Sequence, residues 1–311
     1  METQNATKLV DFILAGLSKA PYLQPFLFVI FLLIYIFTIL GNMIIILTVT
    51  METQLCCPMY HFLRNLSLTE VCYVSVTVPR MLRDFVNHEN HISFTFCATQ
   101  LYFFCFLGTT ECFLLALMAY DRYLAICQPL HYRTVMTKTI CFRVSVGCVF
   151  AAMILSIGQI TFVFSLPFCG TNVIDHYFCD ILPVVGLVCA DTYANEMTIL
   201  MYGALVIASP FVLILVSYAR ILAAVVGIHS EAGRKKTFST CGSHLTSVCL
   251  FYGTAIVTYL RKKSSYANSG AKITSLLYSI VIPMLNPLIY SLRNSQVKQA
   301  MRKHIFRNKQ A

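Results

Sequence analysis

Charged residues are scarce in this chain. Of its 311 residues only 12% are Asp, Glu, Lys or Arg, whereas 58% are hydrophobic, and the mean hydropathy is +0.71. Ordinary soluble domains have about 25% charged residues. The polar surface of this chain is therefore too small to cover a water-soluble globule of the same length. The composition excludes a soluble domain and predicts that much of the apolar surface faces lipid.

Signature motifs of common enzymes are missing as well. The chain has no glycine-rich phosphate loop, no Gly-x-Ser-x-Gly elbow and no His-Glu-x-x-His pair, and its eight histidines are scattered. It has no internal repeat and no low-complexity tract. No basic segment precedes the first apolar run, so we expect that run to act as its own targeting signal. We predict one domain over residues 1–311 that is not an enzyme.

Long runs without any charged residue divide the chain. Five such runs lie between residues 19 and 52, 143 and 175, 196 and 220, 236 and 261, and 272 and 293. Two further apolar stretches carry only isolated acids, and arginines near their ends. A helix needs about 20 apolar residues to cross a bilayer. We therefore predict an all-α bundle of seven transmembrane helices, with spans at about 23–49, 58–84, 94–127, 140–166, 197–226, 237–260 and 272–292.

The basic residues indicate the orientation of these spans. With the N-terminus outside the cell, 15 of the 23 Lys and Arg residues lie on the cytoplasmic side, as the positive-inside rule requires. The triplet Asn5-Ala6-Thr7 is a glycosylation acceptor, which fits an external N-terminus. The net charge of +10 gathers beside span ends, so we expect anionic inner-leaflet lipid, not nucleic acid, as its partner.

The C-terminal segment has an amphipathic pattern. Within residues 293–307, Val297, Ala300, Met301 and Ile305 repeat at three- and four-residue spacing, with basic residues around them. This pattern is typical of a short helix that lies on the inner leaflet, not of an eighth span.

Four of the 14 cysteines fall on the external side of the predicted bundle. Cys97 lies at the start of the third span, and Cys169, Cys179 and Cys189 lie in the loop after the fourth. Four cysteines allow three pairings. A long loop over a pocket is best constrained by one bridge to a helix top and one within itself. We therefore predict the disulfides Cys97–Cys179 and Cys169–Cys189.

Two acidic residues lie where charge is costly. Glu70 of the second span and Glu111 of the third fall near mid-membrane by residue count. Two carboxylates cannot both stay ionised there alone. They must be protonated, share a proton, or hold a cation such as sodium with neighbours such as Ser67 and Asn286. No cofactor other than a sodium ion is suggested by the sequence.

Two motifs near the inner ends of spans suit a conformational switch. In MAYDRYLAICQPLHY, residues 118–132, Asp121 stands beside Arg122. In PMLNPLIYSLRN, residues 283–294, two prolines each remove a backbone donor. The last span should therefore kink and leave carbonyls for polar groups such as Asn286.

Seven segments spread over nearly the whole chain carry a family resemblance. They are Gly41-Asn42, PMYHFLRNLSLTEVCY from Pro58, MAYDRYLAICQPLHY, Ser217-Tyr218, KKTFSTCGSHL from Lys235, FYGTA from Phe251 and PMLNPLIYSLRN. Together they resemble the odorant receptors, which are rhodopsin-like G-protein-coupled receptors, and among these the tetrapod-type class. The chain departs from the family at Cys56-Cys57, His61 and Glu70, where His-Thr, an aromatic residue and Asp are usual. We expect Cys56 and Cys57 to be unpaired thiols, with S-palmitoylation as the alternative.

The resemblance implies a multi-pass receptor of the plasma membrane that binds a small-molecule odorant. It also implies activation of a stimulatory olfactory-type heterotrimeric G protein, which raises cyclic AMP. On activation Arg122 would leave Asp121 and join Tyr218 and His244, while the sixth span swings outward. The residues implied in this switch are Asp121, Arg122, Tyr218, His244, Asn286, Pro287 and Tyr290.

Helical spacing predicts the walls of a ligand pocket. One stripe, on the third span, comprises Phe104, Cys105, Gly108, Thr109 and Cys112. Another, on the sixth span, comprises Phe251, Tyr252, Ala255 and Tyr259. Such stripes are more often simple interhelical packing. The resemblance favours a pocket, and it adds Val206, Ile207, Leu276 and Ser279 to the walls.

The predicted ligand is small, mostly apolar and uncharged. Phe104 occupies the position where amine receptors of this fold have an aspartate, and the inferred pocket offers only hydroxyls and thiols as polar groups. The alternatives are a receptor for a non-volatile ligand and a channel or transporter. A channel would need a polar pore-facing stripe and a transporter broken helices in related halves, and the sequence shows neither.

Overall fold

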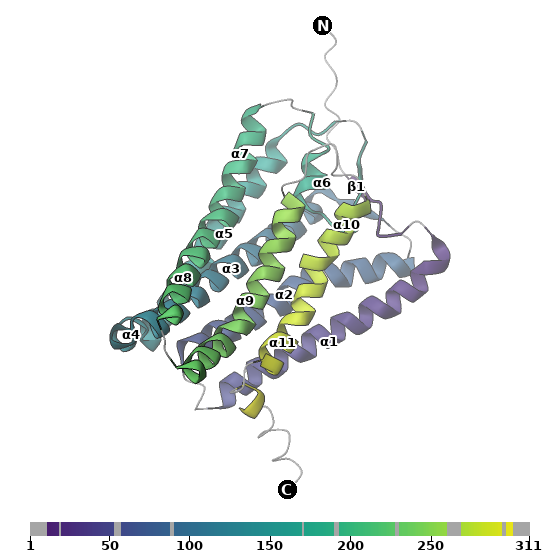
Figure 1. The fold of residues 1–311 in the computed structure, drawn as a ribbon. Coiled ribbons are helices and arrows are strands. Elements are labelled where there is room, and N and C mark those ends of the chain that lie inside the picture. Colours follow the sequence, from purple (N-terminus) through teal and green to yellow (C-terminus); the bar gives the residue numbers. More distant parts are fainter. Residues whose placement is uncertain are drawn as a thin grey trace.

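Long helices run side by side and form a bundle (Figure 1). The structure, a computed structural model, describes residues 11–18, 20–52, 57–87, 90–169, 171–189, 193–227, 230–259, 269–293 and 297–300. The bundle helices of this described part are α1 (Gln24–Met51), α2 (Pro58–Asn87), α3 (Phe94–Cys127), α5 (Lys138–Ser165), the run α7 (Tyr193–Gly203)–η3 (Ala204–Ala208)–α8 (Ser209–Val226), α9 (Glu231–Tyr259) and the run α10 (Ser269–Leu276)–η5 (Leu277–Val281)–α11 (Ile282–Arg293). Strand β1 lies at one end of the bundle and α11 ends at the other.

Several helix starts follow from local chemistry. Ser93 precedes α3 and its hydroxyl accepts the backbone N–H of Phe96, while Thr137 does the same for Ile140 at the start of α5. Such caps satisfy backbone donors that a first turn leaves unpaired. Proline lies in the first turn of α1 and of the short helix α4 (Pro129–Val135), where its missing N–H costs nothing.

The helices differ in how much of their surface faces outward. Within the described residues, five helical runs are long and apolar enough to cross a membrane: 21–51, 94–127, 138–165, 197–226 and 272–291. The most apolar window of α3 is 56% buried, against 22% in α1, so α3 is enclosed by its neighbours. Helices α2 and α9 do not reach the same hydropathy because each has polar residues along its length, and α2 buries half of its residues inside the bundle.

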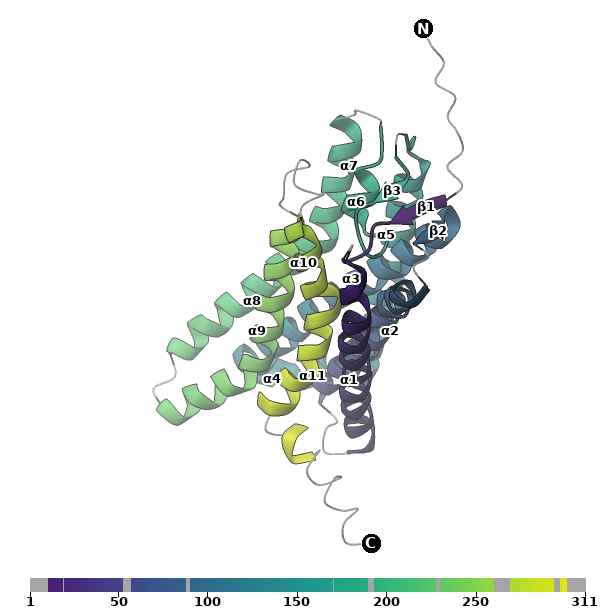
Figure 2. The same ribbon diagram turned by 90° about the vertical axis from the view of Figure 1, so that its right-hand side faces the viewer.

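A small sheet and a short helix cap the bundle at the end that carries β1 (Figure 2). Strand β1 (Asp11–Leu14) pairs antiparallel with β2 (His91–Ser93) and parallel with β3 (Val173–Ile174). Phe12 and Leu14 of β1 are fully buried in an apolar cluster beneath the sheet. We call residues 171–189, which include β3 and α6 (Ile181–Val185), the lid.

Both predicted disulfides are present and attach the lid. The sulfur atoms of Cys97 and Cys179 are 2.03 Å apart, so the lid is joined to the start of α3. Cys169 pairs with Cys189, with 5.7 Å between their Cα atoms, and this bridge closes the base of the lid. The first bridge therefore fixes the lid against the bundle, and the second limits how far the lid can unfold.

Helix α11 packs closely against α1. A Cβ atom added to Gly41 would lie 3.0 Å from Cβ of Pro287, which is tighter than ordinary contact. Asn42, the next residue, donates a hydrogen bond to the Pro283 carbonyl at 3.4 Å. Proline in α11 thus frees a carbonyl for a polar side chain, which is Asn42 of the neighbouring helix α1 and not Asn286, the residue that the sequence suggested.

Some predicted features lie outside the described residues. These are the glycosylation acceptor Asn5, Cys56, and residues 294–296 and 301–307 of the proposed interfacial helix. Residues 297–300 form one helical turn, in which Val297 and Ala300 are buried against the inner core cluster. The interfacial helix stays a prediction.

Candidate functional site

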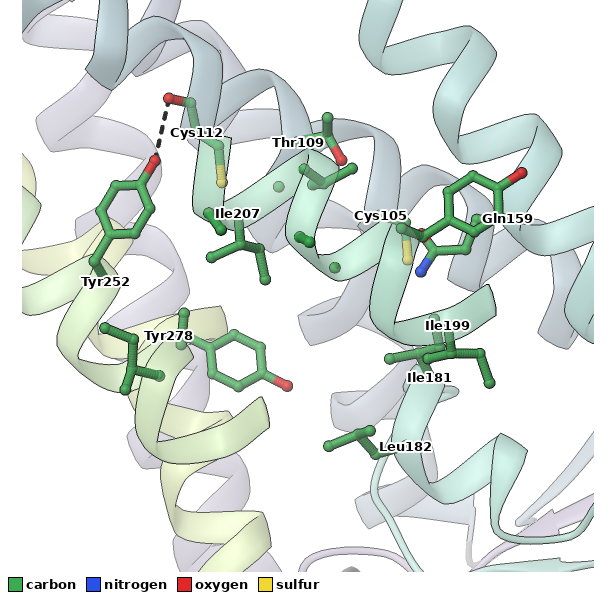
Figure 3. A pocket seen from close by; sticks show the side chains of 18 of the residues that line it. Cys105, Thr109, Cys112, Gln159, Ile181, Leu182, Ile199, Ile207, Tyr252 and Tyr278 are labelled. Atoms are coloured by element: carbon green, nitrogen blue, oxygen red, sulfur yellow. Dashed lines mark hydrogen bonds between the residues drawn. The ribbon is translucent and has the colours of Figure 1, made fainter. Parts of the chain in front are cut away.

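A cavity of about 550 Å³ lies between the helices on the lid side of the bundle (Figure 3). Its walls come from α2, α3, α5, α7, η3, α8, α9, η5 and the lid helix α6. Among the described residues that line it, none carries a charge, and apolar and aromatic side chains predominate. This volume is in the range of small-molecule sites, which are typically apolar with few polar groups.

Ten of the predicted pocket residues line this cavity. All five members of the α3 stripe do so, which places Thr109 and Cys105 on the wall shown in Figure 3. The other predicted lining residues are Val206, Ile207, Phe251, Tyr252 and Ala255. Helical spacing placed the α3 and α9 residues in two stripes, and the family resemblance interpreted these stripes as pocket walls and added Val206 and Ile207.

Three predicted residues are placed differently or not described. Leu276 and Ser279 lie outside the lining, and the side chain of Tyr259 is outside the described part. Ser279 instead hydrogen-bonds the Tyr177 hydroxyl of the lid at 2.9 Å, while Tyr278 lines the cavity. Tyr278 and Ser279 both lie in the π-helical turn η5, where neighbouring side chains point in different directions.

The lid supplies wall residues that sequence reasoning missed. Ile181, Leu182 and Val185 of α6 line the cavity at its lid end, and the first two are labelled in Figure 3. The predicted Cys97–Cys179 bridge was a signal for them, because residues just after Cys179 must lie near the outer end of α3. Gln159 of α5 and Tyr202 of α7 also line the cavity, and no motif marked them.

Polar groups in the cavity are few and neutral. They include the Thr109 hydroxyl, the Gln159 amide and the thiols of Cys105 and Cys112. The Tyr252 hydroxyl is directed to the Cys112 carbonyl at 3.5 Å, and its ring stacks on Phe211. Such a wall can accept or donate one or two hydrogen bonds, but it offers no counter-ion to a charged ligand.

A buried polar cluster holds the lid onto the last helical run. Asp180 Oδ2 accepts hydrogen bonds from the Ser275 and Tyr278 hydroxyls, at 3.2 and 2.5 Å. His176 Nε2 lies 3.0 Å from the Ser275 hydroxyl, and burial lowers the pKa of His176 to about 4. Lys272 adds an ion pair to Asp175 at 2.7 Å. Two consecutive turns of α10 and η5 are therefore tied to the lid.

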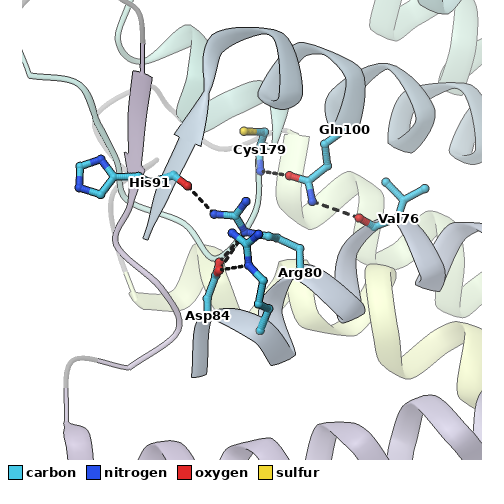
Figure 4. A network of polar contacts seen from close by, with 7 residues as sticks. Val76, Arg80, Asp84, His91, Gln100 and Cys179 are labelled. Carbon is cyan, nitrogen blue, oxygen red and sulfur yellow. Dashed lines mark hydrogen bonds and ion pairs between the residues drawn. The ribbon is translucent and has the colours of Figure 1, made fainter. Parts of the chain in front are cut away.

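A second polar network joins α2, α3 and the lid (Figure 4). Gln100 of α3 accepts the Cys179 backbone N–H at 3.1 Å and donates to the Val76 carbonyl of α2 at 3.1 Å. Beside it, Arg80 pairs with Asp84 at 2.8 Å and donates to the His91 carbonyl at 2.6 Å. Gln100 is buried, so its amide satisfies two backbone groups that would otherwise be unpaired.

The inner half of the bundle contains the predicted switch residues. The Tyr218 hydroxyl of α8 lies 2.7 Å from Nδ1 of His244 on α9. His244 Nε2 donates a hydrogen bond to the Leu115 carbonyl at 3.0 Å. In a neutral imidazole the Nδ1 atom then accepts the Tyr218 hydroxyl. Three helices therefore meet at His244, and the prediction that Arg122 joins Tyr218 and His244 on activation did not include the contact to Leu115.

Asp121 and Arg122 differ from the pairing that we expected. Asp121 is buried and accepts a hydrogen bond from the Tyr132 hydroxyl of α4 at 3.0 Å. No ion pair joins it to Arg122 in the described part of the chain, and the Nε atom of Arg122 has no hydrogen-bond partner there. Adjacent residues on a helix point about 100° apart, so Asp121 faces inward while Arg122 is half-buried.

The two intramembrane acids lie within interaction distance in the centre of the bundle. Asn286 Nδ2 of α11 donates to Glu70 Oε1, and Asn286 Oδ1 accepts the Ser247 hydroxyl at 2.8 Å. Glu111 is buried, and neither of its carboxyl oxygens has a hydrogen-bond partner in the described residues. Glu70 and Glu111 interact electrostatically. This donor set, with one satisfied and one unsatisfied carboxyl group, fits a shared proton or a small cation.

Comparison with known proteins decides the family. A sequence model described as "Olfactory receptor" matches residues 31–309. The chain belongs to the olfactory receptor family. The receptor is 48% identical to human olfactory receptor 10A7 over 98% of its own length and 96% of that protein. It is 46% identical to mouse olfactory receptor 5AR1 over 98% of both chains.

The receptor also has the fold of a solved structure. It superimposes on squid rhodopsin with a TM-score of 0.70 at 15% identity, over 92% of this chain and 86% of that one. This similarity shows the G-protein-coupled receptor fold and confirms the seven-helix bundle. The receptor is therefore a multi-pass protein of the plasma membrane, and its family consists of receptors.

Proposed function

We propose that this receptor detects small, mostly apolar and uncharged odorants in the 550 Å³ cavity. The observation that carries the proposal is the absence of any charged side chain from the described lining, together with the few neutral polar groups. An amine or a carboxylate would lose its hydration there without gaining a partner, which is costly. An apolar molecule that bears one carbonyl or hydroxyl group would bury its chain and keep one hydrogen bond.

The receptor would report binding through a stimulatory olfactory-type G protein, which raises cyclic AMP. Arg122, Tyr218 and His244 lie at the inner end of the bundle, away from the cavity, so ligand must act by favouring one arrangement of the helices. The Tyr218–His244–Leu115 contacts join α8, α9 and α3, which are the helices that also line the cavity. Movement of α9 would therefore affect both sites.

A ligand panel tests this proposal. Cells that express the receptor are exposed to uncharged volatiles, amines, carboxylic acids and non-volatile compounds, and cyclic AMP is measured beside surface labelling. We expect uncharged volatiles to be the best agonists. An Ala255→Trp variant, which fills the cavity, should reach the surface and lose the response, whereas Val257→Trp, on the outer face of the same helix, should keep it. Primary amines or non-volatile compounds as the best agonists would contradict the proposal.

We further propose that Glu70 and Glu111 hold one positive charge between them, either a proton or a sodium ion. The unpartnered Glu111 carboxyl group beside Glu70 supports this, because two free carboxylates would repel each other in the bundle interior. A sodium-specific rise in the thermal stability of the purified receptor, lost in Glu111→Gln, would identify the ion. A carboxylic-acid infrared band lost in the same variant would identify the proton. A wild-type receptor that shows neither the sodium effect nor the carboxylic-acid band would refute both the ion and the proton.

A further inference from the structure

The cavity reaches the outer surface of the bundle on one side. Four of its lining residues are at the same time exposed on the outside: Leu200, Ala204, Ala208 and Ile256. The first three lie on α7 and η3, and Ile256 lies on α9. Leu200 is 63% exposed and Ile256 is 37% exposed, although both contribute to the cavity wall. Among the residues that the structure describes, the cavity is therefore open between α7–η3 and α9.

Small residues keep this opening free. Ala204 and Ala208 extend little beyond the backbone, and at Gly203, another lining residue, an added Cβ would meet nothing within 4 Å. The outer faces around the opening are apolar: Met201, Leu205 and Val257 are exposed there. Exposed apolar side chains on a membrane-spanning helix face lipid tails. The opening consequently leads into the bilayer.

The opposite route, through the lid, is closed. The lid is held by the Cys97–Cys179 bridge, by the Asp180 bonds to Ser275 and Tyr278, and by the Lys272–Asp175 ion pair. Its residues Ile181 and Val184 are buried against the bundle. A ligand that came from water through this side would have to break several of these contacts at once.

We propose that ligands reach the cavity from the outer part of the bilayer, through the opening between α7–η3 and α9. The inference rests on the proposed function, and it adds the access route. Apolar molecules concentrate in the membrane, by roughly fourfold for each CH₂ group. The bilayer therefore acts as the reservoir from which the receptor takes its ligand, and the lid works as a fixed wall.

The cavity thiol Cys105 allows a test that needs no known agonist. The purified receptor in lipid nanodiscs is treated with N-ethylmaleimide, which is uncharged and of odorant size, or with a maleimide that carries a sulfonate group. Labelling of each cysteine is followed by peptide mass spectrometry. The labelling rate of Cys249, which is exposed on α9, serves as the reference for the uncharged reagent in lipid. The labelling rate of Cys57, which is exposed just before α2, serves as the reference for the charged reagent in water. We expect Cys105 to react with the uncharged reagent at least about tenfold faster than with the charged one, after scaling to these references.

Four variants locate the route. Leu200→Trp and Ile256→Trp place a large ring in the opening and should slow the labelling of Cys105 by about tenfold, while Cys249 reacts as before. Met201→Trp and Val257→Trp are matched controls, because these neighbours are equally exposed or more so but do not line the cavity. The controls should label Cys105 at the wild-type rate.

Several outcomes would overturn the route. One is equal labelling of Cys105 by the two scaled reagents, and another is faster labelling by the charged reagent. A third is unchanged labelling in both variants of the opening. The reagent comparison uses the unaltered receptor, so it decides even if a Trp variant fails to fold. No agonist or G protein takes part, so this test can fail while the ligand panel succeeds, and the reverse.

Discussion

His176 makes the lid sensitive to acid. It lies within the lid, fully buried, and burial lowers the pKa of its imidazole from 6.5 to about 4. The charged groups that face it are Asp180 and Asp175, whose charges favour the protonated ring, and Lys272, whose charge opposes it. The net effect is that the closed lid holds neutral His176.

The sign of the pH effect follows from this lowered pKa. Between pH 6.5 and 4 the opened lid binds a proton at His176 that the closed lid excludes, so closure weakens as pH falls through this window. Above pH 6.5 His176 is neutral in both the opened and the closed lid, so closure of the lid keeps its full stability there. With one pKa unit equal to about 1.4 kcal/mol, the loss between pH 7 and pH 5 is about 2 kcal/mol, or about thirtyfold in the closing equilibrium.

Hydrogen–deuterium exchange of the lid measures this equilibrium. Protection factors for the amides of residues 174–181, corrected for intrinsic exchange, should fall about thirtyfold from pH 7 to pH 5. His176→Asn removes the titrating group and should abolish most of this dependence, while α3 amides serve as an internal reference in both proteins. A wild-type lid whose protection is the same at both pH values, or an Asn variant with the full pH dependence, would refute the reasoning.

Three further predictions concern the switch, the lid and the packing of α1. Arg122→Ala should reach the surface and bind ligand but lose agonist-driven cyclic AMP, since Arg122 lies far from the cavity; normal signalling by a surface-expressed variant would contradict its role. Cys97→Ser or Cys179→Ser should lose about 2–5 kcal/mol of stability and, with it, surface labelling, and normal staining would argue against the bridge. Gly41→Ala places a Cβ 3.0 Å from Cβ of Pro287 and should lower the stability by about 1–3 kcal/mol, which a lower thermal midpoint would show. Gly147→Ala is the control, because an added Cβ meets nothing within 4 Å there, and its thermal midpoint should not change.

Much of the site could be predicted because it depends on local patterns. The third helix crosses the bundle as one regular α-helix, so the spacing of Phe104, Cys105 and Thr109 was enough to place them on one wall. The positions of the external cysteines left three disulfide pairings, and the choice among them followed from how two bridges best constrain a long loop. Leu276 and Ser279 were taken from the family resemblance and do not line the cavity, and Ser279 instead bonds to Tyr177 of the lid.

The lid shows the limit of sequence reasoning most directly. Asp180 and Ser275 are 95 residues apart, and their hydrogen bond exists only because the lid folds over the end of α10. Asp121 likewise stands beside Arg122 in sequence but bonds to Tyr132 in the folded chain. Neighbours in sequence on a helix point in different directions, so adjacency predicts a pair that the geometry does not form.

The sequence by itself determined that the chain spans a membrane with seven helices, because the cost of placing charge in lipid acts on each segment separately and leaves a visible pattern of charge-free runs. It also determined the family, through motifs spread along the chain. Only the tertiary structure decided which residues close the cavity, which acid stays unpartnered and where the cavity opens. These properties arise from contacts between segments distant in sequence and from departures from regular helix geometry, and neither has a local signature that composition or spacing could show.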